Sequence, residues 1–256
     1  MEVHHHGHHD HGKKTWKTYF WEFFMLFLAV FCGSLAELQV EHYIEHQREK
    51  RYAQTLFEDL VNDTIDLHND IEFWSRMIRK ADSLRIEIEK PEYARNQALI
   101  YRLVPNMNTN NTFLYHDRTI QQLKSSGNFR LIRKKDIADS IVNYDAWIQK
   151  TINDIENIYG RVVSPQLDQL ANRLFNSGFY KFRNSKAKLD SIQQKDPGAL
   201  RIPAGKDDVL FEYYNTLNSY KGLAQSRVRF LYYQLQSGIN LIAMIKKEYS
   251  VTPIEK

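Results

Sequence analysis

A run of eighteen residues near the start of the chain, residues 19–36, contains a single charged side chain, Glu22. At about 1.5 Å of rise per residue, a helix of this length spans roughly 27 Å, close to the hydrocarbon thickness of a bilayer. Aromatic side chains of the kind found at membrane interfaces gather at its N-terminal edge: Trp16, Tyr19 and Trp21. The run therefore predicts a single transmembrane helix, which we assign to residues 16–38.

The charges on either side of this run differ in sign. Lys13, Lys14 and Lys17 come before it, whereas Glu37, Glu41 and Glu45 follow it, ahead of the first basic residue at Arg48. Basic residues flank the cytoplasmic end of most membrane helices. This asymmetry predicts a cytoplasmic tail at residues 1–15 and an extracytoplasmic domain at residues 39–256.

A basic start followed by an apolar run also describes a secretory signal, so two processing alternatives compete with an anchor. Residues 34–36, Ser-Leu-Ala, resemble a small-x-small cleavage site, and Cys32-Gly33 resembles a lipidation site. Bulky Phe31 stands where lipidation needs a small residue, and the apolar stretch is long for a signal. We therefore expect an uncleaved signal anchor.

The predicted membrane helix has two unlike faces. At about 100° per residue, one face carries Glu22, Leu26, Ala29, Gly33 and Glu37, and the opposite face carries Phe24, Phe27 and Phe31. Small residues four apart let helix backbones approach closely in a bilayer, and a carboxylate prefers a protein surface to lipid. The first face is thus expected to pack against another helix. Two alternatives are that Glu22 reaches headgroup water and that it handles ions.

Histidines gather at two places that could bind a transition metal. The tail contains six of them, at His4, His5, His6, His8, His9 and His11. A second pair, His42 and His46, is four residues apart on one helix face, a spacing that lets two ligands converge. A disordered tail and a solvated helix face are the alternatives, and no other cofactor is expected.

The rest of the chain is low in helix breakers, with only 10 Gly and 6 Pro in 256 residues. Apolar residues at three-four spacing predict a stalk helix that continues the membrane helix through residues 39–89, a helix at about 134–175 that is bent or broken at Gly160 and Pro165, and a last helix at about 207–249. Residues 176–206 read as an irregular excursion. The predicted fold class is all-α, an antiparallel helical bundle.

Catalytic and nucleotide-binding motifs are missing from the sequence. It has no phosphate-cradling glycine loop, nucleophile elbow or paired-cysteine metal site, and its single cysteine, Cys32, lies in the membrane run. The net charge of +4 is not gathered in a dense patch, which argues against nucleic acid. We expect no enzyme. An aromatic stretch of the last helix is a candidate partner surface, through Tyr213, Tyr214, Tyr220, Arg227, Arg229 and Tyr233. The alternative is that its tyrosines cap the bundle core and keep their hydroxyls in water.

Two segments resemble an uncharacterised group of single-pass, membrane-anchored helical proteins of Bacteroidota. They are the stalk segment "HQREKRYAQTLFEDLVNDT", His46 to Thr64, and "TIQQLKSSGNFRLIRKKDIADSIVNYD", Thr119 to Asp145. The resemblance implies a diderm inner membrane and a periplasmic domain, and it brings no catalytic residues.

Together these features predict a non-enzymatic scaffold or accessory subunit of an envelope membrane complex. Its partners would be the lipid bilayer and either copies of itself or other inner-membrane subunits. A periplasmic ligand sensor is one alternative, and it predicts a defined pocket between the bundle helices. A stator-like subunit that uses Glu22 in an ion path is the other.

Overall fold

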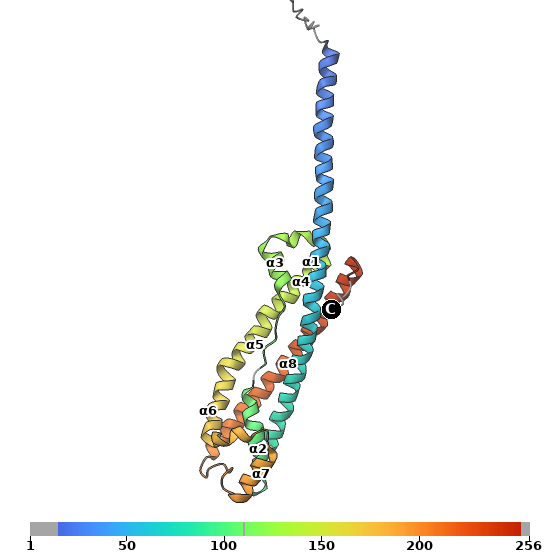
Figure 1. The fold of residues 1–256 in the computed structure, drawn as a ribbon. Coiled ribbons are helices and arrows are strands. Elements are labelled where there is room, and N and C mark those ends of the chain that lie inside the picture. Colours follow the sequence, from blue (N-terminus) through green and yellow to red (C-terminus); the bar gives the residue numbers. More distant parts are fainter. Residues whose placement is uncertain (1–14, 110, 252–256) are drawn as a thin grey trace, which may run out of the picture. The chain divides into compact units, whose positions relative to one another are not determined.

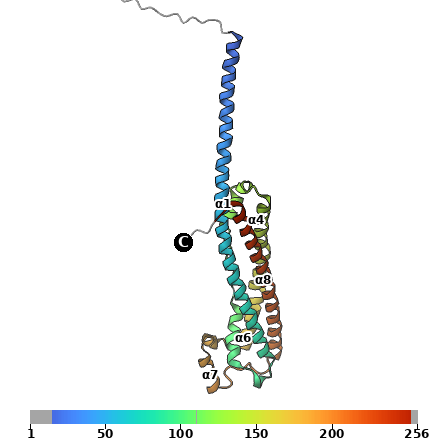
Figure 2. The same ribbon diagram turned by 90° about the vertical axis from the view of Figure 1, so that its right-hand side faces the viewer.

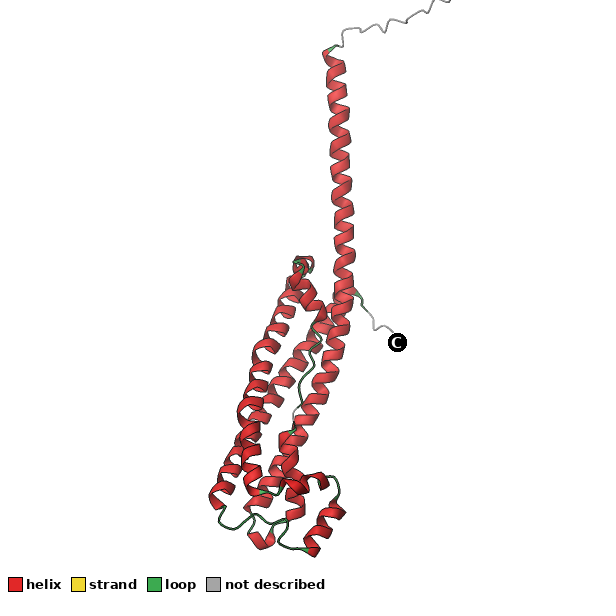
Figure 3. Cartoon of the chain, turned by 60° about the vertical axis from the view of Figure 1, so that its left-hand side comes forward, coloured by secondary structure: helices red, strands yellow, loops and turns green. Residues whose placement is uncertain are grey.

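The computed structural model describes residues 15–109 and 111–251. Every regular element in these two ranges is a helix (Figure 3). The chain divides into two units: one ends at Arg51, and its described part is called the anchor segment below, while the other begins at Tyr52 and is called the helical domain. The predicted all-α class is confirmed.

The longest element is helix α1, Trp16–Glu89, of 74 residues. It includes the apolar run, so one helix near the N-terminus is long and apolar enough to cross a membrane. It ends just before Pro91, because a proline disfavours helical geometry in the residue that precedes it.

Shorter helices and two further long ones complete the helical domain. The α-helices are α2 (Gln97–Leu103), α3 (Arg118–Ser125), α4 (Lys135–Trp147), α5 (Asn153–Ile158), α6 (Ser164–Leu174), α7 (Lys186–Lys195) and α8 (Asp207–Tyr249). Short 3₁₀-helices are η1 (Glu92–Ala94), η2 (Val104–Asn108), η3 (Asn128–Leu131) and η6 (Ser177–Phe182). Two π-helical turns are η4 (Ile148–Ile152) and η5 (Tyr159–Val163).

Helices α4, α5 and α6 follow one another without a break, so of the bend or break expected at Gly160 and Pro165 the break does not occur. The π turns η4 and η5 join them, and Pro165 stands in the first turn of α6 directly after η5. Proline is tolerated in the first turn of a helix, because its missing N–H has no partner to lose there. The change of hydrogen-bond register in the π turn thus absorbs the proline.

Contacts between α1 and α8 show that the two helices run in opposite directions. Glu89 accepts a hydrogen bond from Tyr214, 2.5 Å away, and Asp70 accepts one from Arg227, 3.2 Å away, so residue numbers rise along one helix as they fall along the other. Figure 2 shows α8 alongside the domain part of α1. A Cβ on Gly238 would lie 3.3 Å from Thr64 Cγ2, so α8 approaches closely there.

Helices α4 to α6 run parallel to α1, whereas the sequence predicts an antiparallel bundle. Tyr144 contacts Asp63, and Tyr159 contacts Trp74 further along, so both residue numbers rise together. The physical reason is the connection: after α2 the chain returns as an extended segment, residues 111–117, called the return segment below (Figure 1). This segment carries the chain back before α3 and α4 begin.

One hydrophobic core joins the long helices of the domain. Its largest fully buried side chains are aromatic and include Trp74, Tyr159 and Tyr220. The rings of Trp74 and Tyr159 meet edge to face at 5.1 Å, and those of Tyr159 and Tyr220 lie 5.6 Å apart. Such pairs contribute about 0.5–1.5 kcal/mol each beyond the area they bury.

Candidate functional sites

The anchor segment exposes nearly all of its apolar side chains. The residues of the predicted helix-packing face, Glu22, Leu26, Ala29, Gly33 and Glu37, are all exposed, and Leu26 is 66% exposed. A Cβ placed on Gly33 would meet no described atom within 4 Å apart from its chain neighbours and the backbone of its own helical turn. That this face packs against another helix stays a prediction, and the chain itself leaves the space for it.

Phenylalanines on the other side of the anchor segment stack along the helix. The rings of Phe23 and Phe27 lie 6.5 Å apart, and those of Phe27 and Phe31 lie 5.8 Å apart. Residues four apart on a helix are neighbours, so this ladder follows from sequence spacing alone. An apolar ladder exposed on a helix surface is suited to lipid.

In the part of the chain that the structure describes, the histidines predicted to bind a metal do not belong to a metal-binding group. His42 and His46 are both exposed, and His46 Nδ1 lies 3.4 Å from Glu49 Oε2. Among the described residues, no group of three or more His, Cys, Asp or Glu side chains is arranged so that it could hold a metal ion. The tail histidines, from His4 to His11, lie outside the described residues.

The predicted partner surface on α8 is divided by burial. Tyr213, Tyr220 and Arg227 are at most 2% exposed, so the structure places them in the core and corrects that part of the prediction. The reason is helical spacing, which turns Tyr220 and Arg227 toward Trp74 of α1. The same spacing places Tyr213 against Phe175, at the end of α6. Arg229 and Tyr233 are exposed, whereas Tyr214 is half-buried against Glu89.

Buried carboxylates form a row along the domain part of α1. Asp59, Asp63 and Asp70 are 5%, 1% and 1% exposed. A buried charge is costly unless it is paired and hydrogen-bonded. Each of the three binds the return segment or the start of α3, as the next paragraphs describe.

Asp63 holds the C-terminal part of the return segment. Its Oδ1 accepts the backbone N–H of His116 at 2.8 Å and lies 3.0 Å from His116 Nδ1, and its Oδ2 accepts the hydroxyl of Tyr144 at 3.0 Å. Burial raises the pKa of Asp63, and the hydrogen bonds from His116 and Tyr144 oppose that rise. Burial likewise raises the pKa of Tyr144, which keeps its hydroxyl protonated and able to donate.

Asp70 and Glu156 hold the other part of the return segment through Arg227. Nη2 of this buried guanidinium lies 3.2 Å from Asp70 Oδ2, 2.6 Å from Glu156 Oε1 and 2.9 Å from the carbonyl oxygen of Asn111. Its Cζ lies 4.6 Å from the ring centre of Trp74. Two helices and the return segment therefore meet at one cation.

Asp59 caps α3 from a different helix. Its Oδ2 accepts the backbone N–H of Thr119 at 3.0 Å and the hydroxyl of the same residue at 2.5 Å, and its Oδ1 accepts Arg118 Nη2 at 3.1 Å. Asp117, the residue at the N-cap of α3, makes no capping bond of its own. Asp59 thus supplies the acceptor that the first turn of α3 needs.

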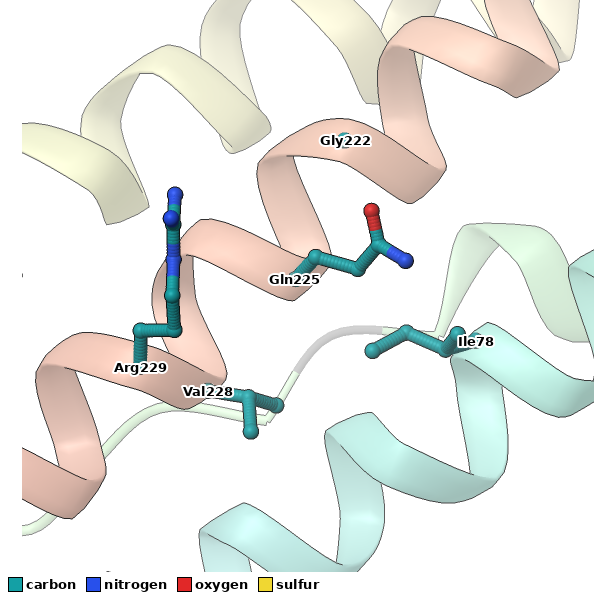
Figure 4. A pocket seen from close by; sticks show the side chains of 5 residues that line it. All are labelled: Ile78, Gly222, Gln225, Val228 and Arg229. Carbon is teal, nitrogen blue, oxygen red and sulfur yellow. The ribbon is translucent and has the colours of Figure 1, made fainter.

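A surface groove lies between α1 and α8, with a volume of about 420 Å³. Figure 4 shows Ile78 on α1 facing Val228 on α8, with the amide of Gln225 extending over the gap. Gly222 and Arg229 complete the lining.

A second groove, of about 550 Å³, lies between α4 and α8 and includes Trp147, Lys150 and Tyr233. The rings of Trp147 and Tyr233 are 4.5 Å apart, and Tyr233 is 59% exposed. Apolar Val142 and Ile239 are also exposed on these two helices. Sequence reasoning missed the contribution of Trp147, although its helical spacing from Ile148 and Tyr144 placed it at the edge of the buried face.

No protein-family model, no curated protein and no solved structure matches this chain.

Proposed function

We propose that this protein is a non-enzymatic, membrane-anchored scaffold or accessory subunit of an envelope membrane complex. The observation that carries the proposal is a contrast in the use of side chains. The anchor segment exposes an almost continuous apolar surface. In the helical domain, by contrast, the buried carboxylates of Asp59, Asp63 and Asp70 form hydrogen bonds and ion pairs within the fold. Carboxylates committed to the fold are poor candidates for acid–base chemistry.

The proposed topology is a single pass through an inner membrane, with the N-terminus in the cytoplasm and residues 39–256 as a periplasmic helical bundle. Support comes from the three lysines before the apolar run and the three glutamates after it. The resemblance to membrane-anchored helical proteins of Bacteroidota agrees with this orientation.

Thiol labelling tests the orientation, because the chain has one cysteine, Cys32, and it can be replaced by serine. In that background, Thr15→Cys and Ser126→Cys place single exposed thiols on either side of the run. The proposal expects a membrane-impermeant maleimide added to spheroplasts to label Ser126→Cys and to spare Thr15→Cys. The reverse pattern would reject the proposed orientation.

In the proposed complex, the anchor packs through the face that carries Glu22, Ala29 and Gly33, against a copy of itself or another subunit. The small side chains allow close approach, and the carboxylate gains a polar neighbour. The domain then docks envelope partners through exposed surface, of which the groove beside Trp147 and Tyr233 is one candidate.

Mass measurement of the full-length protein in mild detergent tests this packing. Gly33→Leu introduces a side chain where no described atom lies within 4 Å apart from the chain neighbours and the backbone of the same helical turn, so any loss of assembly reflects a partner. The matched control is Phe27→Leu on the opposite face. The proposal expects wild type and Phe27→Leu to carry copies or other membrane proteins, and Gly33→Leu to lose them. Bare monomers in all three would reject it.

The ligand-sensor alternative draws less support from the domain. Both grooves described above open on the surface, and the centre of the domain is occupied by aromatic side chains in mutual contact. The ion-path alternative has a separate test: Glu22→Gln would leave assembly intact and abolish function. Under the packing proposal, Glu22→Gln keeps a polar group on the face and preserves both.

A further inference from the structure

The groove between α4 and α8 gathers polar side chains that have no partner within the fold. The two helices lie side by side (Figure 2), and five residues that line the groove carry polar groups: Asn143, Lys150, Thr151, Tyr233 and Ser237. Within the described part of the chain, none of these five side chains forms a hydrogen bond or an ion pair. An amide, an ammonium group and three hydroxyls are thus available at one surface groove.

The unbonded hydroxyls differ from others on the same two helices. The hydroxyl of Ser140 on α4 donates to the backbone carbonyl four residues earlier at 2.7 Å, and that of Thr216 on α8 does the same at 2.9 Å. Serine and threonine in helices often satisfy their hydroxyls in this way. Among the described residues, Thr151 and Ser237 form no such bond, so their hydroxyls can serve a ligand.

Two aromatic rings supply most of the apolar surface of the groove. The planes of Trp147 and Tyr233 are inclined by 43°, and Phe230 supports the indole ring at 5.8 Å. The indole N–H of Trp147 is buried and has no hydrogen-bond partner in the part of the chain that the structure describes. The only aliphatic side chain in the lining is the methyl group of Ala146. The groove therefore combines flat aromatic surface with free polar groups.

The wall of the groove includes an irregular turn of the helix. Lys150 and Thr151 belong to the π turn η4. A π turn has more residues per turn than an α-helix, so neighbouring side chains diverge less and both can border the same groove. Turns of this kind occur frequently at functional sites. The departure from α-helical geometry thus coincides with the free polar groups.

We propose that this groove binds an oligosaccharide chain. A sugar ring presents C–H groups on its faces and hydroxyl groups around its edge, so it needs a flat aromatic surface together with hydrogen-bond donors and acceptors. Trp147 and Tyr233 supply the first, and the amide and hydroxyls supply the second. Lys150 lies among lining residues that include no acid, which favours a sugar that carries a carboxylate.

The shape and lining of the groove favour a sugar chain over a peptide helix. Its volume of about 550 Å³ is within the range of ligand sites, roughly 300–1,000 Å³, and it opens on the surface, so a polymer can extend beyond it. A docked helix needs pockets for large apolar side chains at three-four spacing. Val142 and Ile239 are exposed on these helices but do not line the groove.

This proposal deepens the scaffold function, on which it rests, because it names the chemistry of one partner of the helical domain. The two fail separately. Sugar binding with bare monomers in the mass measurement would reject the assembly and keep the saccharide site. An intact assembly that binds no sugar would reject the saccharide site alone.

The test titrates full-length protein in phosphatidylcholine nanodiscs with tetramers of glucose, N-acetylglucosamine and galacturonic acid, and measures binding by calorimetry. The proposal expects at least one tetramer to bind, and Tyr233→Ala to weaken that binding at least about tenfold with an unchanged melting curve. The matched control is Tyr232→Ala. This neighbour on α8 is 56% exposed, against 59% for Tyr233, and does not line the groove, so the variant should bind like wild type.

A second variant tests the preference for a carboxylate. Wild type should bind the galacturonic acid tetramer about two- to fivefold more tightly than the glucose tetramer, as expected for an exposed ion pair. Lys150→Met should remove this difference and leave the affinity for the glucose tetramer unchanged.

Three outcomes would overturn the proposal. Absence of binding by all three tetramers at concentrations up to about 10 mM would exclude a saccharide site of useful affinity. Equal weakening by Tyr232→Ala and Tyr233→Ala would place the binding outside the groove. Binding of decaproline that depends on Tyr233, with no binding of any tetramer, would show that the groove is a peptide site.

Discussion

The two parts of helix α1 use the same secondary structure in opposite ways. In the anchor segment apolar side chains face outward: Phe23 is 66% exposed and Leu26 is 66% exposed. In the helical domain the same helix buries Leu67 completely, together with the carboxylates of Asp63 and Asp70. A helix that exposes its apolar side chains needs an apolar solvent, whereas one that buries acids needs polar partners from other elements.

This contrast shows that hydrophobic pattern alone does not separate inside from outside. In the domain part of α1 the buried face includes acids because the return segment has no helical hydrogen bonds of its own. Its backbone N–H groups at Phe113 and His116 are satisfied by Glu156 and Asp63. An extended segment inside a helical domain thus requires buried acceptors, and α1 and α5 supply them.

The largest expected effect comes from replacing a leucine by arginine in each of the two parts of α1. Leu67→Arg puts a charge among fully packed side chains, and we expect the domain to lose cooperative unfolding, a loss of more than about 4 kcal/mol. Leu26→Arg should leave domain unfolding unchanged and reduce the membrane-bound fraction, because a central arginine costs roughly 2.5–3.5 kcal/mol on insertion. Circular dichroism melts and membrane flotation measure the two effects.

The comparison would fail if Leu26→Arg lowered the melting temperature of the domain as much as Leu67→Arg. It would also fail if both variants stayed fully in the membrane fraction and melted like wild type. Leu67→Met and Leu26→Met are the size-matched controls, and each should remain close to wild type in both assays.

The next largest effect concerns the cation that joins α1, α5 and the return segment. Arg227→Met leaves the buried Asp70 and the partly buried Glu156 without their common cation, and we expect a loss of about 3–5 kcal/mol. Urea unfolding followed by far-ultraviolet circular dichroism measures it. Arg227→Lys keeps the charge without the planar fork, so it should recover only part of the loss. Wild-type stability of Arg227→Met would show that the cation does not hold the domain.

Much of the fold follows from the sequence, because helix spacing and breakers are local signals. The apolar run and the end of α1 near Pro91 are visible in this way. The continuity from α4 to α6 is not, since Gly160 and Pro165 signal a break that the π turn η5 absorbs. Such a register change depends on packing around it.

The parallel course of α4 to α6 and the burial of the acids could not be predicted from the sequence, for a related reason. Asp59, Asp63 and Asp70 look like a solvated face until the return segment, which has no regular pattern, is known to lie against them. Likewise the sequence allows Tyr213, Tyr220 and Arg227 to lie either on a partner surface or at the bundle core, since tyrosines on long helices can do both. The burial of Arg227 depends on its ion pairs with Asp70 and Glu156, which are distant in the sequence.

A smaller effect is expected at the cap of α3. Asp59→Ala removes the acceptor for the N–H and hydroxyl of Thr119, and we expect a loss of about 1–3 kcal/mol. Hydrogen exchange should rise first at the amides of α3, because the start of that helix loses its acceptor. Asp117→Ala is the matched control: this residue precedes the helix but makes no capping bond, so its exchange should match wild type.

The smallest effect, and the one that most sharpens the contrast between buried and exposed acids, is the pH dependence at Asp63. Its pKa in the folded protein is raised above the ordinary value of 3.8, mainly by burial. The folded state therefore takes up this proton before the unfolded state does as the pH falls. The resulting contribution to the free energy of unfolding is complete below about 3.8 and is lost as the pH rises through the folded pKa.

Asp63→Asn has no such proton, so wild type should gain stability relative to this variant as the pH is lowered from neutral toward 4, by about 1 kcal/mol or less. At neutral pH the variant should be as stable as wild type or slightly more stable, because the amide avoids the cost of a buried charge. His116 and Asp66 face the same site, so the pair is also compared in a His116→Gln background, where the sign should persist. A stability difference that shrinks on acidification in both backgrounds would mean that the bonds from His116 and Tyr144 outweigh burial.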